Sequence, residues 1–582
     1  MDVIVRYFCS TSGQVESKYF TSEFLGHTRA EDLLEKLEKL NLPSKYMLQL
    51  SMDGPNVNIK VQKDLQKKRK IENLPQLLDT GTCSLHTVHN AFKCGFEKYF
   101  DVHILLKACG KLFRGSPARY AEYKSITGSN VMPALFCGTR WVEDKKVAER
   151  LVEIWPNIVK YITETEKKPK KDIPSSKHYE TVKSAVITDK LVIPKLKEFI
   201  SIASLLQPYL TKFQADGPMM PFVCSELLIV LTDLMSKFLD PDVLKDIGMY
   251  AAATLSLDTN QLTVQNVKIS YAAKSALNQL KATGKISARQ ILEFKGDCLN
   301  IYKTICTKLQ EKSPLKYTLS RKVVSLNPKV IMMEYGPAVD AFETVLNKLA
   351  DNDWIRADQP EVLLSQFRRF ARECKRDKEQ EFLDYDPTEM RLDQFYSKHL
   401  DGKDQYKDLW SIIKLLLTIS HGQAAVERGF SVNKDSLKDN LQETSLVSRR
   451  IVFDALKGVN LSNYVIPKAL LESCKHASER YKKFLATKEK NEEAQTKERK
   501  RKALSAEILD VKKRKLQLEK RATSMTDEAN LKYLEAEKSK KPRDLIIEAN
   551  ASRAKADELR EKSIPDLEKT IKNLEKEMKL YY

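Results

Sequence analysis

The sequence predicts a mostly helical protein with a small α/β segment at its N-terminus and a coiled-coil tail. Three observations support this fold class. The chain opens with β-branched and aromatic runs separated by a polar turn, which is typical of strands. The central part carries apolar residues at the three-to-four-residue spacing of helices. Beyond Asn463 the composition changes to Lys, Glu, Ala and Leu, which favours long helices.

The N-terminal residues predict a β-hairpin followed by a helix. Residues 3–8 and 15–24 form two extended runs, and the polar stretch 10–14 provides the turn between them. Residues 28–40 then place leucines on one side of a helix, with Thr28 as its N-cap.

A third apolar run, residues 46–52, is short enough to be a strand and delivers Asp53 to its C-terminal end. Gly54 and Pro55 stop this strand and expose the carboxylate, which is the placement expected of a metal ligand in an open α/β sheet. The alternative is an Asp-Gly-Pro turn that binds nothing. The residues alone leave both interpretations open.

From residue 90 to residue 407 the sequence is mostly helical. The clearest internal loop is the Lys- and Pro-rich stretch 166–176. Residues 409–419 then form an apolar helix that is too short and too interrupted to span a bilayer. Within the central region, helices are expected at residues 194–207, 220–238, 287–309 and 337–350.

The tail is predicted to form a helical hairpin or coiled coil, because an apolar stripe on a long helix cannot be buried by that helix alone. Pro565 breaks the tail between two seams that keep alternating spacings of four and three residues. The first seam is Leu504, Ile508, Val511, Lys515 and Leu518, and the second is Leu567, Ile571, Leu574 and Met578.

Two basic clusters lie on this tail, at residues 497–502 and 512–515. They suit contacts to DNA phosphates or a nuclear-localisation signal. The alternative is a solvated face of a long helix. The candidate contact residues are Lys500, Arg501, Lys513 and Arg514.

The net charge and the apolar content of the sequence indicate which class of partner to expect. The net charge of +20 favours polyanions such as nucleic acid. No segment reaches the roughly 18 consecutive apolar residues of a membrane span, and no signal-peptide pattern opens the sequence, so an intracellular protein without a membrane partner is expected. The ten cysteines are sparse and unevenly spaced, which predicts reduced thiols and no disulfide framework.

Residues 421–431 carry the most informative motif, because they place an acid, Glu427, directly after the apolar helix at 409–419. A carboxylate close to a core requires a proton, a cation or a metal ion. The alternative is an ordinary ion pair at a helix N-terminus.

The run Ala424-x-x-Glu427-Arg428-x-Phe430-Ser431 resembles the C-terminal dimerisation region of hAT-superfamily transposases, with Val426 where the family has Ser. The resemblance implies an RNase H-like α/β sheet interrupted by a large all-helical insertion. It also implies that Glu427 is the third metal-binding carboxylate and Asp53 the second, with Mg²⁺ or Mn²⁺ as cofactor if the site is active. The implied dimerisation residues are Phe430, Leu437, Leu441, Arg449 and Arg450.

Two further motifs support the same resemblance. Cys83-x-x-His86 follows the Asp-Gly element, and Arg140-Trp141 is similar to a family motif whose aromatic stacks near the cleaved DNA end. The resemblance makes these four residues, together with Arg428, candidates for DNA contact. Cys83 and His86 supply only two of the four ligands that a zinc site needs, so zinc is not predicted. The alternative for Trp141 is a place in the core.

The first catalytic Asp is expected to be missing, and the sheet incomplete at its N-terminus. An RNase H-like sheet opens with three meandering strands, whereas only two extended runs precede the helix at residues 28–40. Asp2 is the only acid that could substitute, and its terminal position argues against a buried ligand because terminal residues fray. The BED-type zinc finger of many hAT transposases has no counterpart here.

The sequence thus divides into a partial RNase H-like segment (1–90), a helical insertion (91–407), a C-terminal RNase H-like helix with the dimerisation region (408–463) and a basic tail (464–582). The expected function is a nuclear, DNA-associating homodimer or larger homo-oligomer, transposase-derived and without cleavage activity or a small-molecule substrate. One alternative is an active metal-dependent transposase or nuclease whose first Asp is supplied by Asp2 or by sequence upstream. The other is a helical interaction protein that acts through its basic tail.

Overall fold

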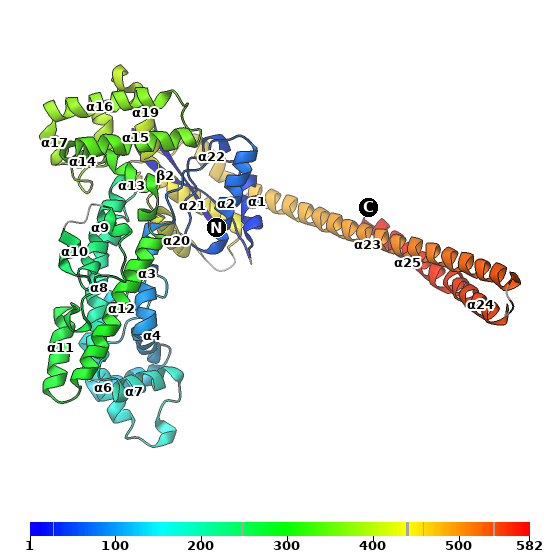
Figure 1. The fold of residues 1–582 in the computed structure, drawn as a ribbon, viewed down its shortest axis with the longest axis horizontal. Helices are drawn as coiled ribbons and strands as arrows, with labels where there is room; N and C mark the ends of the chain where they lie inside the picture. Colours follow the sequence, from blue (N-terminus) through cyan, green and yellow to red (C-terminus); the bar gives the residue numbers. More distant parts are fainter. Residues whose placement is uncertain are drawn as a thin grey trace. The chain divides into compact units, whose positions relative to one another are not determined.

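The computed structural model describes residues 1–26, 28–245, 250–437, 441–457, 459–538, 540 and 542–581. The chain forms two compact units, Met1–Lys457 and Gly458–Tyr582, which are described separately. The protein is 72% helical, which confirms the prediction of a mostly helical fold (Figure 1).

The predicted N-terminal hairpin is confirmed. Strands β1 (Asp2–Cys9) and β2 (Gln14–Ser22) pair antiparallel, with an irregularity between Val3 and Ile4. Gly13 closes the turn with a φ of 66°, and its amide donates to the Cys9 carbonyl at 2.9 Å. Glycine suits this position because the left-handed region carries no steric cost without a Cβ atom.

Two helices follow the hairpin, α1 (Ala30–Lys39) and α2 (Asn56–Ile71). They enclose a small apolar cluster around Leu33 and Val61. The predicted cap of α1 is wrong by one residue: Arg29 is the N-cap, and the Thr28 hydroxyl donates to the Gly26 carbonyl at 2.8 Å instead.

The predicted strand at residues 46–52 is not formed. In the part of the chain that the structure describes, the sheet contains only β1 and β2, so the structure does not show an RNase H-like sheet. A short 3₁₀ turn, Ser44–Tyr46, precedes an extended segment whose Leu48 carbonyl accepts from the Leu78 amide at 2.9 Å. A strand requires a ladder of such bonds to a neighbour, and here coil segments supply the partners.

The helical region fills the rest of the first unit, and the four helices predicted within it are confirmed as α8, α9, α12 and α15 (Figure 1). In order, its helices are α3 (Ser84–Tyr99), α4 (Val102–Leu112), α5 (Pro117–Thr127), α6 (Lys145–Thr165), α7 (Lys177–Thr188), α8 (Val192–Lys212), α9 (Met220–Met235), α10 (Pro241–Lys245), α11 (Tyr271–Ala282), α12 (Ala288–Lys312), α13 (Thr318–Lys322), α14 (Pro328–Met333), α15 (Tyr335–Asp351), α16 (Gln359–Asp377), α17 (Glu379–Leu383), α18 (Leu392–Leu400) and α19 (Lys407–Leu417).

The core of this region depends on a close approach of α3 to α12. Gly95 makes the approach possible, because a Cβ atom there would lie 2.8 Å from Ile305 Cγ1. Phe92 and Phe96 of α3 pack against Phe199 of α8, with ring centroids 4.8 and 5.1 Å from it. Helix α3, whose start carries the Cys-x-x-His motif, is therefore packed into the core.

The last two helices of the first unit, α20 (Ala424–Ser436) and α21 (Glu443–Leu456), return to the N-terminal hairpin. The Tyr19 amide donates to Asp454 at 3.1 Å, and the Arg450 guanidinium lies 4.7 Å from the centroid of the Tyr19 ring. The beginning and the end of this unit are thus folded against each other.

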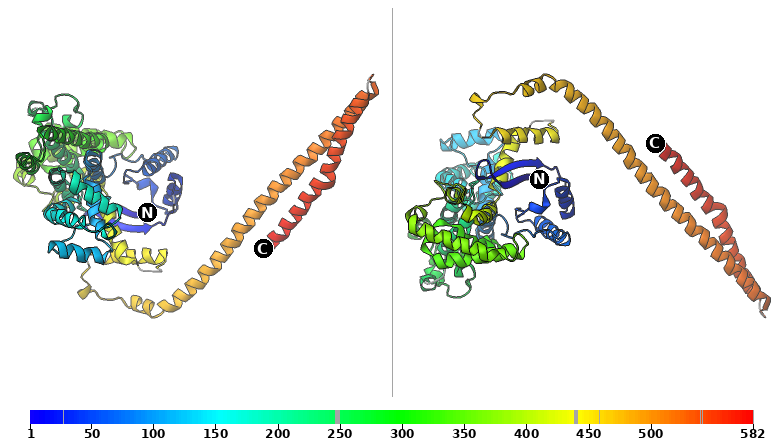
Figure 2. Two further views of the ribbon diagram at one scale, coloured as in Figure 1. Left: turned by 90° about the horizontal axis from the view of Figure 1, so that it is seen from below. Right: turned by 90° about the horizontal axis from the view of Figure 1, so that it is seen from above.

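The second unit is an antiparallel helical hairpin, as predicted (Figure 2). After the short α22 (Lys468–Lys475), the long α23 (Ala477–Lys538) packs against α24 (Pro542–Glu558) and α25 (Ile564–Met578). One turn of π-helix, Leu559–Ser563, joins α24 to α25 beside Pro565.

The two predicted seams face each other, with Ile508 and Ile571 at their buried centres. Interhelical ion pairs join the two arms, among them Lys515 to Glu568 at 2.7 Å. Towards the turn the interface consists of alanines spaced seven residues apart, which let the backbones approach closely. These are Ala522, Ala529 and Ala536 on one arm and Ala549 and Ala556 on the other.

Candidate functional site

Three motifs that are far apart in the sequence meet at the carboxylate of Glu427. Arg140 Nη2 donates to Glu427 Oε2 at 2.6 Å, across 287 residues of sequence. His86 Nδ1 lies 3.4 Å from Glu427 Oε1. Glu427 sits in the first turn of α20 and His86 in the first turn of α3, so two helix starts and one loop form the cluster.

The environment of Glu427 explains why it tolerates partial burial. Its side chain is 17% exposed, whereas those of Arg140 and His86 are 38% and 35% exposed. The guanidinium supplies the cation that a carboxylate near a core requires. Glu427 also lies in the first turn of its helix, where the helix dipole favours negative charge.

Cys83 and its neighbours fasten this cluster to the chain around residue 421. Cys83 is buried, and burial raises the pKa of its thiol. The Ser84 hydroxyl donates to the His421 carbonyl at 3.2 Å. A Cβ atom at Gly422 would lie 3.4 Å from the Cys83 sulfur, so the two segments are in close contact. In this position the Cys83 side chain packs between helix starts.

Trp141 takes the core position that was the alternative to base stacking. Its side chain is 1% exposed, and its indole N–H donates to the Gly138 carbonyl at 3.1 Å. The rings of His103 and Phe136 cover it at centroid distances of 4.9 and 5.2 Å. In this conformation the indole cannot stack on a base. It anchors the loop that presents Arg140.

Sequence reasoning assigned no role to two buried titratable groups behind this loop. Asp144 Oδ1 accepts from the Cys137 amide at 2.6 Å, and burial raises the pKa of the Asp144 carboxyl to about 7. His89 Nδ1 accepts from the Val142 amide at 3.3 Å, and burial lowers the pKa of His89 to about 3. The available signal was their position, because both flank the predicted motifs within a few residues.

Asp53 lies in the loop before α2, and the Asn58 side-chain amide donates to its carboxylate. The next residue, Gly54, lies against Thr82, so this loop is adjacent to the start of α3. Within the described ranges, no group of three His, Cys, Asp or Glu side chains is placed to hold a metal ion. Glu427 already forms an ion pair with Arg140, so the described residues do not form the ligand set of a two-metal centre.

Asp2 does not complete the set. Its carboxylate accepts from the Ser22 hydroxyl at 2.6 Å and from the Asn433 side-chain amide at 2.8 Å. It lies over the face of α20 that contains Gly429 and Asn433. At about 100° per residue, Glu427 points about 200° away from Gly429. Asp2 and Glu427 therefore occupy different faces of the helix and cannot share an ion.

The structure divides the predicted dimerisation residues between surface and interior. Phe430 and Leu437 are more than half exposed, and Leu441 is half-buried. Arg449 is exposed and donates to the Ser436 carbonyl at 3.1 Å, whereas Arg450 is buried under Tyr19. An apolar run beside them, Ile451, Val452 and Phe453, is also exposed.

Arg428 is engaged within the protein. It donates to the Gln214 carbonyl at 2.6 Å and forms an ion pair with Asp216, both in the loop between α8 and α9. Its side chain remains 44% exposed. Contact with DNA would require it to exchange one of these partners.

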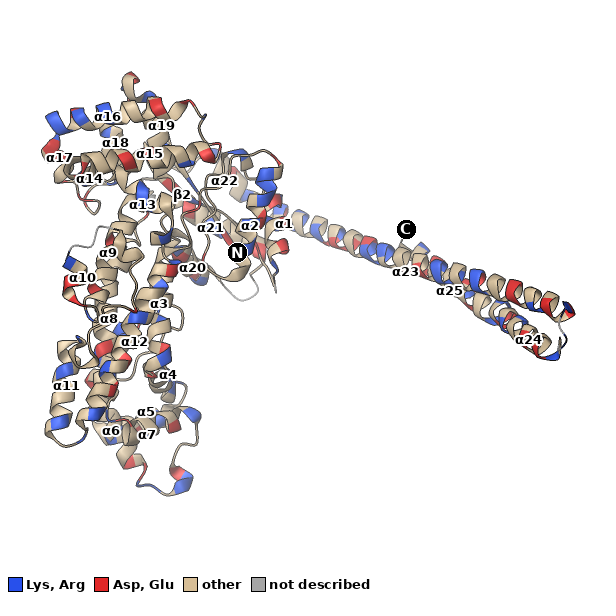
Figure 3. Cartoon of the chain, in the orientation of Figure 1, with Lys and Arg blue, Asp and Glu red and all other residues tan. Residues whose placement is uncertain are grey.

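The tail carries 31 Lys and Arg against 22 Asp and Glu in residues 458–582 (Figure 3). Arg501 pairs with Glu498 at 2.7 Å and Arg514 with Asp510 at 2.9 Å. Lys500 lies 5.2 Å from the centroid of the Tyr581 ring, and Lys513 is exposed. The remaining positive surplus lies in the first unit.

No protein-family model matches this chain, and a search of curated proteins found no significant match. The helices in the described ranges include none with the length and apolar character needed to cross a bilayer.

Proposed function

We propose that this protein is a nuclear, DNA-associating and self-associating relative of hAT transposases that does not cleave DNA. The observation that carries the proposal is the meeting of His86, Arg140 and Glu427 in one cluster. Each belongs to a different motif of the resemblance, and two of the motifs lie hundreds of residues from the third. Their convergence supports a common origin of the three motifs.

An RNase H-like ancestry of the N-terminal segment is part of this proposal. The order of hairpin, helix α1 and an extended segment that ends at Asp53 supports it. Residues 46–52 lie beside Ser420, whose amide donates to Gln49 Oε1 at 2.8 Å. The segment before Asp53 therefore reaches the segment before Glu427, as the ancestral arrangement requires.

Loss of cleavage activity is supported by the partners of Glu427. Two-metal phosphoryl transfer uses carboxylates that hold two divalent ions. A metal ion at Glu427 would have to displace the Arg140 guanidinium, which is already bound at 2.6 Å. Asp2 faces away from this site, as described above. Mg²⁺ or Mn²⁺ belongs only to the alternative of an active enzyme.

Self-association is supported by the exposed apolar side chains on α20 and α21. Phe430 on α20, Leu437 directly after that helix, and Val452 and Phe453 on α21 are each at least half exposed. Clustered exposed apolar residues mark interaction sites in soluble proteins. A second copy of the chain is the occupant that the resemblance implies.

The test is a cleavage and binding assay on purified protein with nicked or branched DNA and Mn²⁺. We expect DNA binding without metal-dependent cleavage. Glu427→Gln should leave binding unchanged, as should the control Glu443→Gln at an exposed position of α21. Cleavage that Glu427→Gln abolishes and Glu443→Gln preserves would contradict the proposal.

The second candidate is an interaction protein that acts through its tail, and the basic surplus of residues 458–582 favours it. Deletion of this unit distinguishes the two. If residues 1–457 retain DNA affinity and a salt-dependent binding constant, the first unit is the DNA-binding element. Complete loss of both would favour the tail.

A further inference from the structure

Helix α16 carries a row of arginines on its outer face. Arg368, Arg369, Arg372 and Arg376 are all exposed, at spacings of one, three and four residues that keep them on one side of a helix. The opposite face is apolar and anchors α16 in the core. Its buried side chains are Leu363, Leu364, Phe367, Phe370, Ala371 and Cys374.

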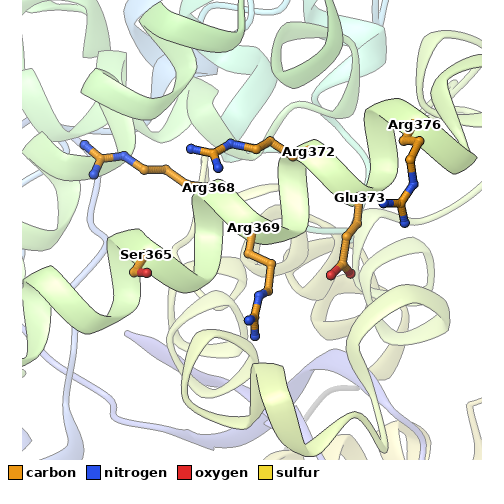
Figure 4. Close-up of a pocket in the computed structure, with 6 residues that line it drawn as sticks. All are labelled: Ser365, Arg368, Arg369, Arg372, Glu373 and Arg376. Atoms are coloured by element: carbon orange, nitrogen blue, oxygen red, sulfur yellow. The ribbon is translucent and has the colours of Figure 1, made fainter.

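These arginines line a hollow of about 520 Å³ together with Ser365 and Glu373 (Figure 4). The six residues extend over about 16 Å of helix at 1.5 Å per residue. The lining contains no apolar side chain, so the hollow suits a hydrophilic, charged ligand and lacks the aromatic or aliphatic anchors of a protein interface. We call it the arginine groove.

The charges of the groove are only partly compensated. Glu373 accepts from the Tyr406 hydroxyl at 2.6 Å, and Arg372 donates to the neutral Tyr335 hydroxyl at 3.2 Å. Arg376 forms two bonds of 2.8 Å to its neighbour Asp377.

Arg368 and Arg369 have no acidic partner in the described part of the chain. Many other surface cations of this unit are paired, as Arg289 is with Glu293 at 2.8 Å. Arg372 lies four residues after Arg368 and three after Arg369, and like charges at these spacings repel one another on a helix surface. A bound anion would offset this repulsion.

We propose that the arginine groove binds the phosphodiester backbone of duplex DNA. This inference rests on the proposed function and assigns a surface to it. Guanidinium groups bind phosphate oxygens through two parallel N–H bonds, and a row of them suits a polyanion with regularly repeated charges. Such contacts fix position and orientation on DNA without reading its sequence.

The experiment measures the binding constant of the full chain for a duplex DNA at several salt concentrations. We expect Arg368→Ala with Arg369→Ala to lower the affinity on the order of tenfold and to reduce the salt slope by about 2, since each lost phosphate contact removes about 0.9. The matched control removes two exposed lysines that form no ion pair within the described ranges, Lys281 in the last turn of α11 and Lys285 shortly after it, as Lys281→Ala with Lys285→Ala. It should change the slope little.

Two further measurements distinguish the loss of positive charge from a change in structure, and a DNA ligand from an acidic protein ligand. Arg368→Lys with Arg369→Lys should keep most of the slope, because the positive charge is retained. Unlabelled DNA should displace the probe, whereas polyglutamate at equal charge should not. Equal displacement by polyglutamate would overturn the inference in favour of an acidic protein partner.

The outcomes distinguish this inference from the function on which it rests. If the parent binds DNA and the arginine variant keeps its slope, the groove is not a DNA site and the proposed function stands. An equal loss in the lysine control has the same meaning, because it shows a general charge effect. Failure of the parent to bind DNA overturns both.

Discussion

The ion pair between Arg140 and Glu427 can be tested by a double-mutant cycle, since it joins two of the three motifs that meet in the site. The changes are Arg140→Ala, Glu427→Gln and both together. All four tryptophans of the chain lie in the first unit, so their fluorescence during urea unfolding follows this unit alone. The quantity of interest is the coupling free energy of the two residues.

The distance and the exposure of the pair allow an order-of-magnitude estimate of this coupling. At 2.6 Å between the charged atoms and an effective dielectric constant of about 20, the Coulomb attraction is about 6 kcal/mol. Desolvation of the 17%-exposed carboxylate and the ordering of two side chains offset most of it. We expect a net coupling of about 2 kcal/mol, the value typical of hydrogen bonds between charged groups.

Arg289 and Glu293 provide the control pair. Their nitrogen and oxygen lie 2.8 Å apart on one helix, but the side chains are 88% and 56% exposed. The same cycle should give at most about 0.5 kcal/mol there, because solvent screens the pair. If the coupling of Arg140 and Glu427 is no larger than that of the control, the two residues do not form a stable pair, and the explanation for the partial burial of Glu427 is refuted.

Two further predictions concern stability. Burial raises the pKa of the Asp144 carboxyl from 3.8 to about 7, so the free energy of unfolding should fall by about 3 kcal/mol between pH 5 and pH 8. Asp144→Asn should remove this loss. In urea unfolding, the difference in stability between the variant and the parent should therefore grow with pH. Gly95→Ala should lower the free energy of unfolding by about 1 to 3 kcal/mol because its Cβ atom would lie 2.8 Å from Ile305, whereas Gly296→Ala, with its nearest atom at 3.9 Å, should be neutral or stabilising. A flat pH response of the difference for Asp144→Asn, or equal effects of the two glycine variants, would contradict these assignments.

The spacing of apolar residues in the sequence was sufficient to predict the helices and strands that bury one face. The hairpin, the long helices and the two tail seams follow from apolar spacing, because the same spacing decides which side chains face the core. The apolar spacing did not predict the alanine interface of the tail. Ala522 and Ala529 add little to an apolar pattern, and their importance comes from the close approach of the opposite arm.

The extended run at residues 46–52 shows why composition alone could not define the sheet. Its apolar residues are typical of a strand, but a strand exists only beside a partner. The site shows a similar limit. Glu427 was expected to need a cation, and nothing in the local sequence identifies Arg140, 287 residues away, as the group that supplies it. Only the folded chain brings them together.

The packing of α21 on the N-terminal hairpin has a consequence for synthesis on the ribosome. Tyr19 and its hydrogen-bond partner Asp454 are separated by 435 residues. At translation rates of about 5 to 20 residues per second, roughly 20 to 90 s pass between the emergence of the two. During this interval the paired strands lack the helix that later covers them, and a nascent chain of this length is vulnerable to aggregation through that face.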